Sequence, residues 1–176
     1  GRTAIQHAIT AVGNTHTDTS VKKIGTASAQ FDGSGDYLSV PDSTDWDFTF
    51  SNDFTVEGWI YPATDLATDT QFIGFGDGND GGNFGFEDTG EPYFYESGYY
   101  ARTNTALTLE EWSHVAFVRS SGTLSCYING ASEASSSYSG NVGGTLDPRI
   151  GAYSGGQYFS GYMDEIRISD SARYTS

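Results

Sequence analysis

Apolar and polar residues alternate in several short segments of the chain. The clearest alternation runs through residues 54–61, 112–119, 124–128 and 162–168. A period of two places successive side chains on opposite faces of an extended strand, so each segment is predicted to be a half-buried strand. Residues 115–118 are apolar throughout, which is typical of a strand covered on both faces at the centre of a sandwich.

Turn-forming residues separate these segments. Glycine accounts for 23 of the 176 residues, and it gathers with serine, asparagine and aspartate in runs such as 32–35 and 76–82, a composition that favours turns. The pair Asn129-Gly130 is the strongest hairpin signal, because a two-residue type I′ turn needs positive φ at both positions. We expect ten strands, near residues 27–32, 36–40, 53–62, 70–76, 83–87, 92–96, 112–120, 123–129, 146–151 and 158–169.

Helical periodicity is scarce, and only residues 107–111 look locally helical, for a single turn. Ten strands without intervening helices predict an all-β fold of two antiparallel sheets. The length suits one domain of ordinary size, so residues 1–176 are predicted to form a single sandwich. Residues 1–26 are expected to supply an N-terminal strand.

The charge balance narrows the choice of partners. The 23 acidic and 8 basic residues give a net charge of −15, which repels nucleic acids and anionic lipid surfaces. The same excess of carboxylates suits divalent cations or a saline habitat. No apolar run approaches the ~20 residues needed to span a bilayer, so no membrane insertion is expected.

Five motifs occur in the order typical of one family. They are FDGSGDYLSVP (31–41), DFTVEGWIYP (53–62), EWSHVAFVRSSGTLSCYING (111–130), RIGAYS (149–154) and YFSGYMDEIRISDSARYT (158–175). In this order they resemble the laminin-G-like, concanavalin A-like lectin/glucanase family. The resemblance implies a jelly-roll β-sandwich. The ending DSARYTS is similar to junctions between tandem modules of large surface or virion proteins, which implies neighbouring modules of a longer parent chain and an extracellular or virion-surface location.

Calcium is the cofactor expected. The glycine-rich turn from Asp32 to Asp36 could aim several oxygens at one cation. Members of the family that the chain resembles often tie the first and last strands together through a calcium ion, and the matching residues here are Asp32 and Asp164. The alternative is that Asp32 caps its turn while Asp164 or Glu165 pairs with an arginine.

Tyrosines are concentrated between residues 93 and 100, with more aromatic residues at 153–159. Sugars stack their C–H faces on aromatic rings, while amide and carboxylate groups bind the hydroxyls. The candidate ligand-binding residues are therefore Tyr93, Tyr95, Tyr99, Tyr100, Trp46, Asn104 and Gln157. The alternative is that alternate aromatics belong to the core. The loop at residues 77–83 is expected to be a flexible surface loop, or else to contact a second cation or glycan hydroxyls.

Signals of catalysis are missing from the sequence. The E-x-D-x-x-E pattern of related glucanases is absent, and the three histidines show no metal-ligand spacing. His114 is expected to be a hydrogen-bonded structural residue. The sequence therefore predicts a non-catalytic carbohydrate-binding or adhesion module, stabilised by calcium. A purely structural spacer of a fibre or capsid is the main alternative, and a glycoside hydrolase is a weaker one.

Overall fold

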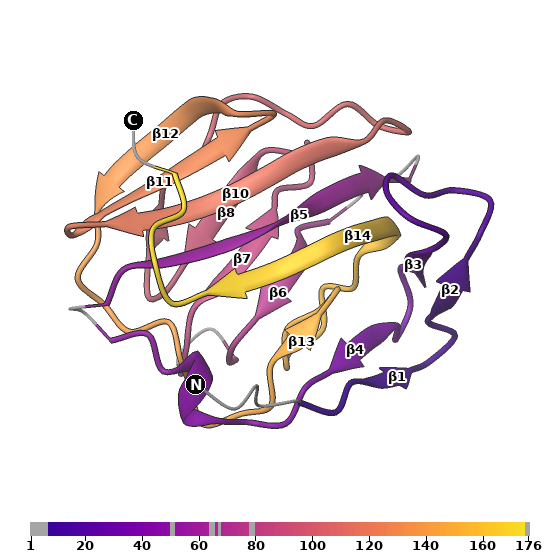
Figure 1. Ribbon diagram of the computed structural model, residues 1–176, viewed down its shortest axis with the longest axis horizontal. Coiled ribbons are helices and arrows are strands. Elements are labelled where there is room, and N and C mark those ends of the chain that lie inside the picture. The colour runs from indigo at the N-terminus through magenta and orange to yellow at the C-terminus, as the bar shows by residue number, and fades with distance from the viewer. Residues whose placement is uncertain (1–6, 50–51, 64–65, 67, 78–79, 175–176) are drawn as a thin grey trace.

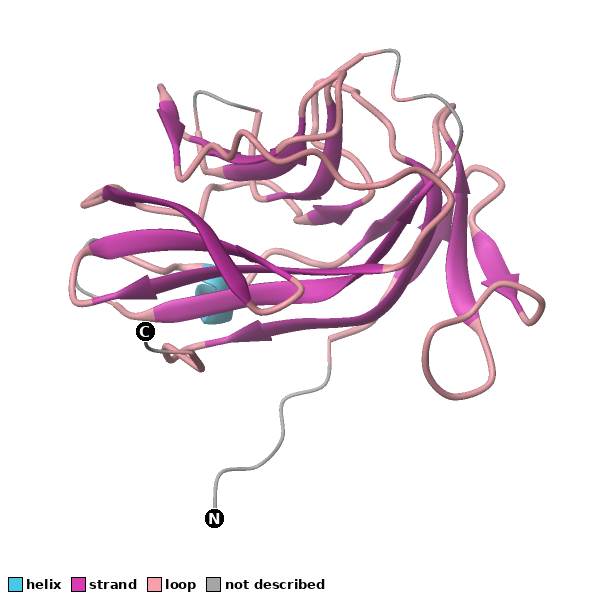
Figure 2. Cartoon of the chain, turned by 90° about the horizontal axis from the view of Figure 1, so that it is seen from above, coloured by secondary structure: helices cyan, strands magenta, loops and turns pink. Residues whose placement is uncertain are grey.

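The chain folds into two antiparallel β-sheets packed face to face, as the computed structural model shows for residues 7–49, 52–63, 66, 68–77 and 80–174 (Figures 1 and 2). The first sheet contains, in spatial order, β1 (Thr10–Val12), β4 (Tyr37–Ser39), β13 (Arg149–Ile150), β6 (Thr70–Gly74), β7 (Asn83–Phe86), β8 (Pro92–Tyr95) and β9 (Tyr99–Tyr100). The second contains β12 (Ala131–Ser137), β11 (Thr123–Ile128), β10 (Ser113–Ser120), β5 (Phe54–Pro62), β14 (Ser160–Ser169), β3 (Ser28–Asp32) and β2 (His16–Asp18).

The predicted antiparallel sandwich is confirmed, and each of the ten predicted strands has a counterpart within a few residues. The hairpin at Asn129-Gly130 is also present, with φ of 50° and 83° at its two positions. Its second strand, β12, was not predicted, because the sequence ASEASSS is polar and mostly exposed and so shows no alternation. Strand β9, of two residues, was missed as well, and the N-terminal region supplies two short strands, β1 and β2.

The expected helical turn at residues 107–111 is wrong. Leu109 and Glu110 form a turn, with a positive φ of 58° at Glu110. The helix that the structure does contain among its described residues is a 3₁₀ turn, η1 (Thr44–Trp46), capped by the Ser43 hydroxyl. No helix of the described residues is long and apolar enough to cross a membrane.

Phenylalanine rings fill the space between the sheets. Phe84 on β7 is fully buried, and its ring centroid lies 5.0 Å from that of Phe117 and 6.2 Å from that of Phe54, both on the second sheet. Within its own sheet, Phe84 contacts Phe94 at 4.6 Å. Aromatic pairs at such distances add to the free energy of burial. Phe84 therefore connects the two layers at the point where both are most apolar.

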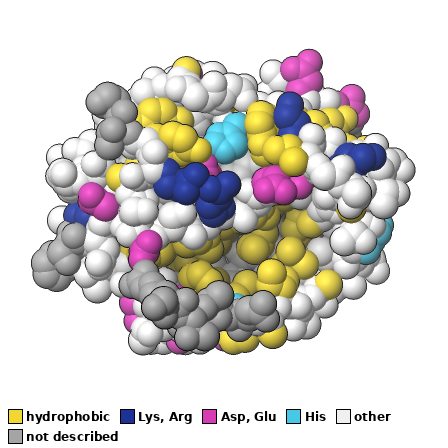
Figure 3. Space-filling model, in the orientation of Figure 1, with side chains coloured by type: hydrophobic (Ala, Val, Ile, Leu, Met, Phe, Trp, Pro, Cys, Tyr) yellow, Lys and Arg dark blue, Asp and Glu magenta, His cyan; other side chains and the backbone are white. Residues whose placement is uncertain are grey.

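The outer face of the second sheet holds the C-terminal segment. The carboxylate of Glu57 on β5 is 3% exposed, lies 2.9 Å from Nε of Arg173, and accepts a hydrogen bond of 2.5 Å from the Tyr174 hydroxyl. His114 on β10 lies 3.4 Å from the same carboxylate, which places it as a structural residue, and burial lowers its pKa. These contacts hold the chain end across β5, on the side of the molecule seen in Figure 3.

Replacing Phe84 with alanine is expected to lower the free energy of unfolding by about 3–5 kcal/mol, because the cavity would open where rings from both sheets meet. Urea denaturation measures the loss. Leu109→Ala, at a residue that is 42% exposed, is the control and should cost less than about 0.5 kcal/mol. Equal effects of the two substitutions would contradict this account of the core.

Candidate functional site

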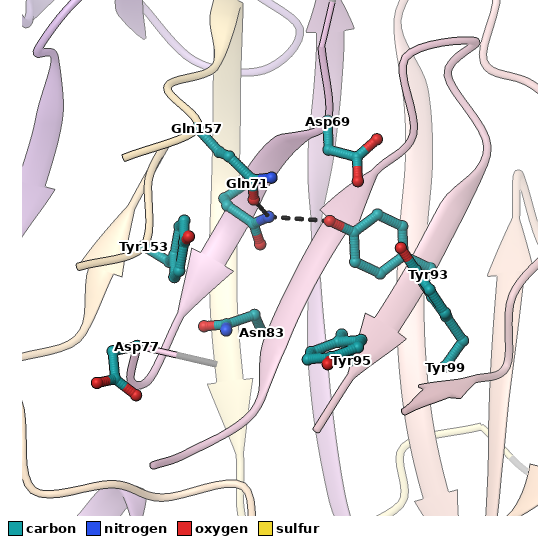
Figure 4. A pocket seen from close by; sticks show the side chains of 9 residues that line it. All are labelled: Asp69, Gln71, Asp77, Asn83, Tyr93, Tyr95, Tyr99, Tyr153 and Gln157. Atoms are coloured by element: carbon teal, nitrogen blue, oxygen red, sulfur yellow. Dashed lines mark hydrogen bonds between the residues drawn. The ribbon is translucent and has the colours of Figure 1, made fainter. Parts of the chain in front are cut away.

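A pocket of about 450 Å³ lies on the outer face of the first sheet. Strands β6 to β9 form its floor and one wall, and the loop between β13 and β14 forms the other wall (Figure 4). The residues that line it are Asp69, Gln71, Asp77, Asn83, Tyr93, Tyr95, Tyr99, Tyr153 and Gln157.

Strand alternation places these side chains on the outer face. The inward positions of three neighbouring strands are fully buried phenylalanines, Phe72, Phe84 and Phe94. Residues next to an inward position point to the opposite face of the sheet. The floor of the pocket is therefore made by the neighbours of these phenylalanines, which are Gln71, Asn83, Tyr93 and Tyr95.

A glycine makes room for Tyr93. Gly85 on β7 pairs with Tyr93 on β8, and a Cβ atom at Gly85 would lie 2.8 Å from both Cζ and the hydroxyl oxygen of Tyr93. The tyrosine ring can therefore lie directly over the glycine. Its hydroxyl reaches across β7 and accepts a hydrogen bond of 3.0 Å from Nε2 of Gln71 on β6.

Gln71 also holds the opposite wall of the pocket. Its Nε2 donates a second hydrogen bond of 2.7 Å to Oε1 of Gln157, and its backbone N–H donates to the carbonyl of Gln157 at 3.2 Å. Gln157 has a φ of 54°, in the left-handed region that residues other than glycine seldom adopt. Such conformations persist only where the surroundings hold them, and they are enriched at binding sites.

Two buried amide oxygens in the floor have no hydrogen-bond partner among the described residues. They are Oε1 of Gln71 and Oδ1 of Asn83, on side chains that are 2% and 3% exposed. An unpaired buried acceptor costs about 1–3 kcal/mol. Both residues line the open pocket, so a bound hydroxyl or amine could donate to these oxygens.

Tyrosine rings form one side of the pocket. Tyr99 is 49% exposed, and its ring centroid lies 5.1 Å from that of Tyr93 and 5.3 Å from that of Tyr95, in edge-to-face geometry. Tyr153 stands on the other side of the floor (Figure 4). Rings placed in this way offer apolar faces beside polar groups, the combination that suits a sugar.

Two carboxylates stand at opposite ends of β6. Asp69 comes directly before this strand and Asp77 three residues after it (Figure 4). Burial, together with the negative charge of Glu87, raises the pKa of Asp69. Burial and the charge of Asp69 likewise raise the pKa of Tyr99. The environment at the Asp69 end is therefore already negative.

The structure brings four of the predicted ligand-binding residues together in this pocket: Tyr93, Tyr95, Tyr99 and Gln157. Three others lie elsewhere. Tyr100 follows Tyr99 and so points to the opposite face of the sheet, where it packs against Phe94 and Tyr138. Trp46 is half-buried in η1 against His7, and Asn104 is exposed in the loop after β9 and does not line the pocket.

Several residues of the pocket were missed from the sequence. Asn83 and Asp77 belong to the loop for which glycan contacts were one alternative, and residues 78–79 of that loop lie outside the described residues. Asp69 and Gln71 were not predicted at all. Gln71 could have been found as a polar residue next to the inward-facing Phe72, on a strand paired with two aromatic strands.

The predicted calcium ligands do not form one cluster. Asp32 and Asp36 lie together, but their oxygens bind the chain itself: Asp32 accepts from the backbone N–H of Ser34 at 2.8 Å, and Asp36 accepts from the N–H groups of Asp32 and Asn14. These bonds cap the turn, as the alternative reading of Asp32 had it. A hydrogen bond from the Asn14 side chain, followed by the bond from Ser34, lowers the pKa of Asp32.

Asp164 lies on β14, four residues from the position that pairs with Asp32. Its Oδ2 accepts hydrogen bonds from the backbone N–H groups of Lys23 and Ile24, at 2.9 and 2.8 Å. No group of three or more acidic, histidine or cysteine side chains that could hold a metal is found among the described residues. The three carboxylates therefore do not fit a shared calcium ion.

A family model described as the concanavalin A-like lectin/glucanases superfamily, of the laminin G type, matches residues 32–175. The chain belongs to this family. Membership agrees with the observed jelly-roll sandwich and with the motifs read from the sequence. Among curated proteins, none matches the chain in sequence.

Solved structures share the fold. Domain 4 of an extracellular arabinanase from Geobacillus stearothermophilus, in complex with arabinotriose, superposes with a TM-score of 0.71 at 23% identity, over 94% of this chain and 82% of that domain. The binding domain of Paraclostridial Mosquitocidal Protein 1 gives 0.75 at 14% identity, over 96% of this chain and 45% of the other.

The binding domain of Botulinum Neurotoxin DC, in complex with SialylT, gives a TM-score of 0.69 at 13% identity, over 96% of this chain and 44% of the other. This chain thus spans less than half the length of the two toxin binding domains. At these identities the likeness shows a common fold.

Substituting Gly85 with alanine is expected to displace the Tyr93 ring, because the new methyl group would overlap its hydroxyl end. Overpacking of this kind costs about 1–3 kcal/mol, measured as a loss of unfolding free energy in urea. Gly98→Ala is the matched control in the next turn, where a Cβ would meet no atom within 4 Å. Equal stability of the two variants would show that Tyr93 does not depend on Gly85.

Proposed function

We propose that this domain is a non-catalytic carbohydrate-binding module, and that the tyrosine pocket on the first sheet is its binding site. The observation that carries the proposal is the pair of buried, unpartnered amide oxygens of Gln71 and Asn83 at the floor of a pocket walled by tyrosines. A sugar can supply both of the missing interactions, since its hydroxyls donate hydrogen bonds and its C–H faces stack on rings.

The arrangement supports binding better than bond cleavage. The two carboxyl groups of a glycosidase lie roughly 5–9.5 Å apart across the scissile bond. The carboxylates that line this pocket, Asp69 and Asp77, flank the five-residue strand β6, which is about 17 Å long at the usual rise per residue. Each is therefore placed to bind a hydroxyl at one end of a ligand.

The fold relatives point in the same direction. The arabinanase domain was solved with arabinotriose and the neurotoxin binding domain with SialylT, so this sandwich accepts oligosaccharides in other proteins. Fold alone does not fix function, and the pocket is the part of the argument that belongs to this chain. An extracellular or virion-surface location, a role in adhesion and neighbouring modules stay predictions from the family resemblance.

Replacing Tyr95 and Tyr99 together with alanine is expected to abolish retention on immobilised polysaccharide, because both stacking faces are removed. The loss of unfolding free energy should stay within about 1–2 kcal/mol, since Tyr99 is half exposed and only edge-to-face ring contacts are lost. Affinity electrophoresis against a panel of polysaccharides measures the binding, and release of reducing sugar is followed in the same samples.

Tyr162→Ala is the control, because this tyrosine lies on β14 in the other sheet. It should keep full retention. Unchanged retention in the double variant would contradict the proposed site. A loss of stability much larger than expected would favour the structural-spacer alternative, and release of reducing sugar would favour a hydrolase.

Calcium stabilisation remains a prediction from the sequence, and it has a direct test. A ligand at 100 times its Kd adds about 2.7 kcal/mol to the native state, so EDTA should lower Tm if calcium is bound. A fall in Tm that is absent in Asp36→Asn would place the ion at the turn of residues 32–36. An unchanged Tm of the wild-type domain in EDTA would contradict the prediction.

A further inference from the structure

The charges around the tyrosine pocket are all of one sign among the residues that line it. Asp69 and Asp77 are the charged groups, and no lysine, arginine or histidine is among the nine described residues that form the pocket. Glu87 adds to the negative environment of Asp69. The two unpartnered oxygens of Gln71 and Asn83 are also negative ends of dipoles.

The two arginines in contact with pocket residues are already engaged. Arg102 lies over the Tyr99 ring at 5.1 Å, and its guanidinium forms an ion pair of 2.6 Å with Glu87. Arg149 on β13 lies over the ring of Tyr37 at 4.5 Å, on the side of β13 away from β6. Neither provides an uncompensated positive charge for a ligand.

The remaining positive charge gathers on the other side of the molecule. Figure 3 shows lysine and arginine side chains clustered on the outer face of the second sheet, around a central histidine. Lys23 lies over the Trp59 ring at 4.2 Å on that face, and Arg167 and Arg173 lie beside the Glu57 carboxylate. The two sheets therefore present faces of opposite electrostatic character in a chain whose net charge is −15.

We infer that the pocket selects glycans without acidic groups and rejects those that carry carboxylate or sulfate. The inference rests on the proposed function and adds the class of sugar to it. A neutral sugar donates hydroxyl protons to Asp69, Asp77 and the two amide oxygens. A uronate or sulfate group in the same place would meet two carboxylates and no cation, and it would also have to give up its hydration.

Matched ligands test the inference. Arabino-, xylo-, cello- and galacto-oligosaccharides are titrated against the full domain by calorimetry. Each neutral oligosaccharide that binds and has primary hydroxyls is then compared with its oxidised form, in which those hydroxyls are carboxylates. We expect the oxidised form to bind at least tenfold more weakly than its neutral parent.

Variants separate the local charge of the pocket from the net charge of the protein. Asp69→Asn combined with Asp77→Asn removes two charges from the pocket and should narrow the gap between neutral and oxidised ligands at least threefold. Asp42→Asn combined with Glu165→Gln removes two charges at exposed positions outside the pocket, and it should leave the gap as in the wild type. Circular dichroism and Tm establish that both variants are folded.

Each outcome has a defined meaning. An oxidised ligand that binds as tightly as its neutral parent overturns the inference but leaves the proposed function in place. Equal effects of the two double variants also overturn it, because the discrimination would then come from net charge alone. If no neutral oligosaccharide binds and Tyr95→Ala with Tyr99→Ala changes nothing, the proposed function fails, and the inference fails with it.

Discussion

The layer of phenylalanine rings between the two sheets is the constraint on which the rest of the structure depends. Phe84 contacts rings of both sheets, and Phe72, Phe84 and Phe94 occupy the inward positions of three adjacent strands without exposed surface. A shift of one residue in any of these strands would turn a phenylalanine to solvent and a polar side chain into the core. The packing of the core therefore also determines which residues face outwards, and the candidate site is the outer face of the same strands.

That outer face is assembled with unusual economy. Glycine at position 85 leaves space for the Tyr93 ring, and the Tyr93 hydroxyl then meets Gln71 on the next strand. Gln71 in turn fixes Gln157, which belongs to a loop far away in the sequence. Because both N–H groups of the Gln71 amide are used in this network, its oxygen is left facing the pocket. An unsatisfied buried acceptor is costly in the free protein, and a ligand that donates to it recovers that cost on binding.

Electrostatics divides the molecule in two. The first sheet carries a pocket whose charged groups are carboxylates, while the second carries a buried glutamate, Glu57, surrounded by arginines and by the end of the chain. In a strongly acidic chain, the few basic residues that are not paired near the pocket thus stabilise the fold on the opposite side. The consequence for recognition is that attraction in the pocket must come from stacking and hydrogen bonds, which give modest affinity per domain.

The sequence by itself determined the class of fold and the location of most strands, because a period of two and glycine-rich turns are local signals that survive without knowledge of the partners. It also pointed to Tyr93, Tyr95, Tyr99 and Gln157. The tertiary structure alone decided that Asp69 and Gln71 complete this group, that Tyr100 belongs to the core, and that Asp164 binds the N–H groups of Lys23 and Ile24 and not a cation shared with Asp32. The reason is physical: these outcomes depend on the register between strands far apart in the chain, and register is fixed only when the two sheets close on their common core.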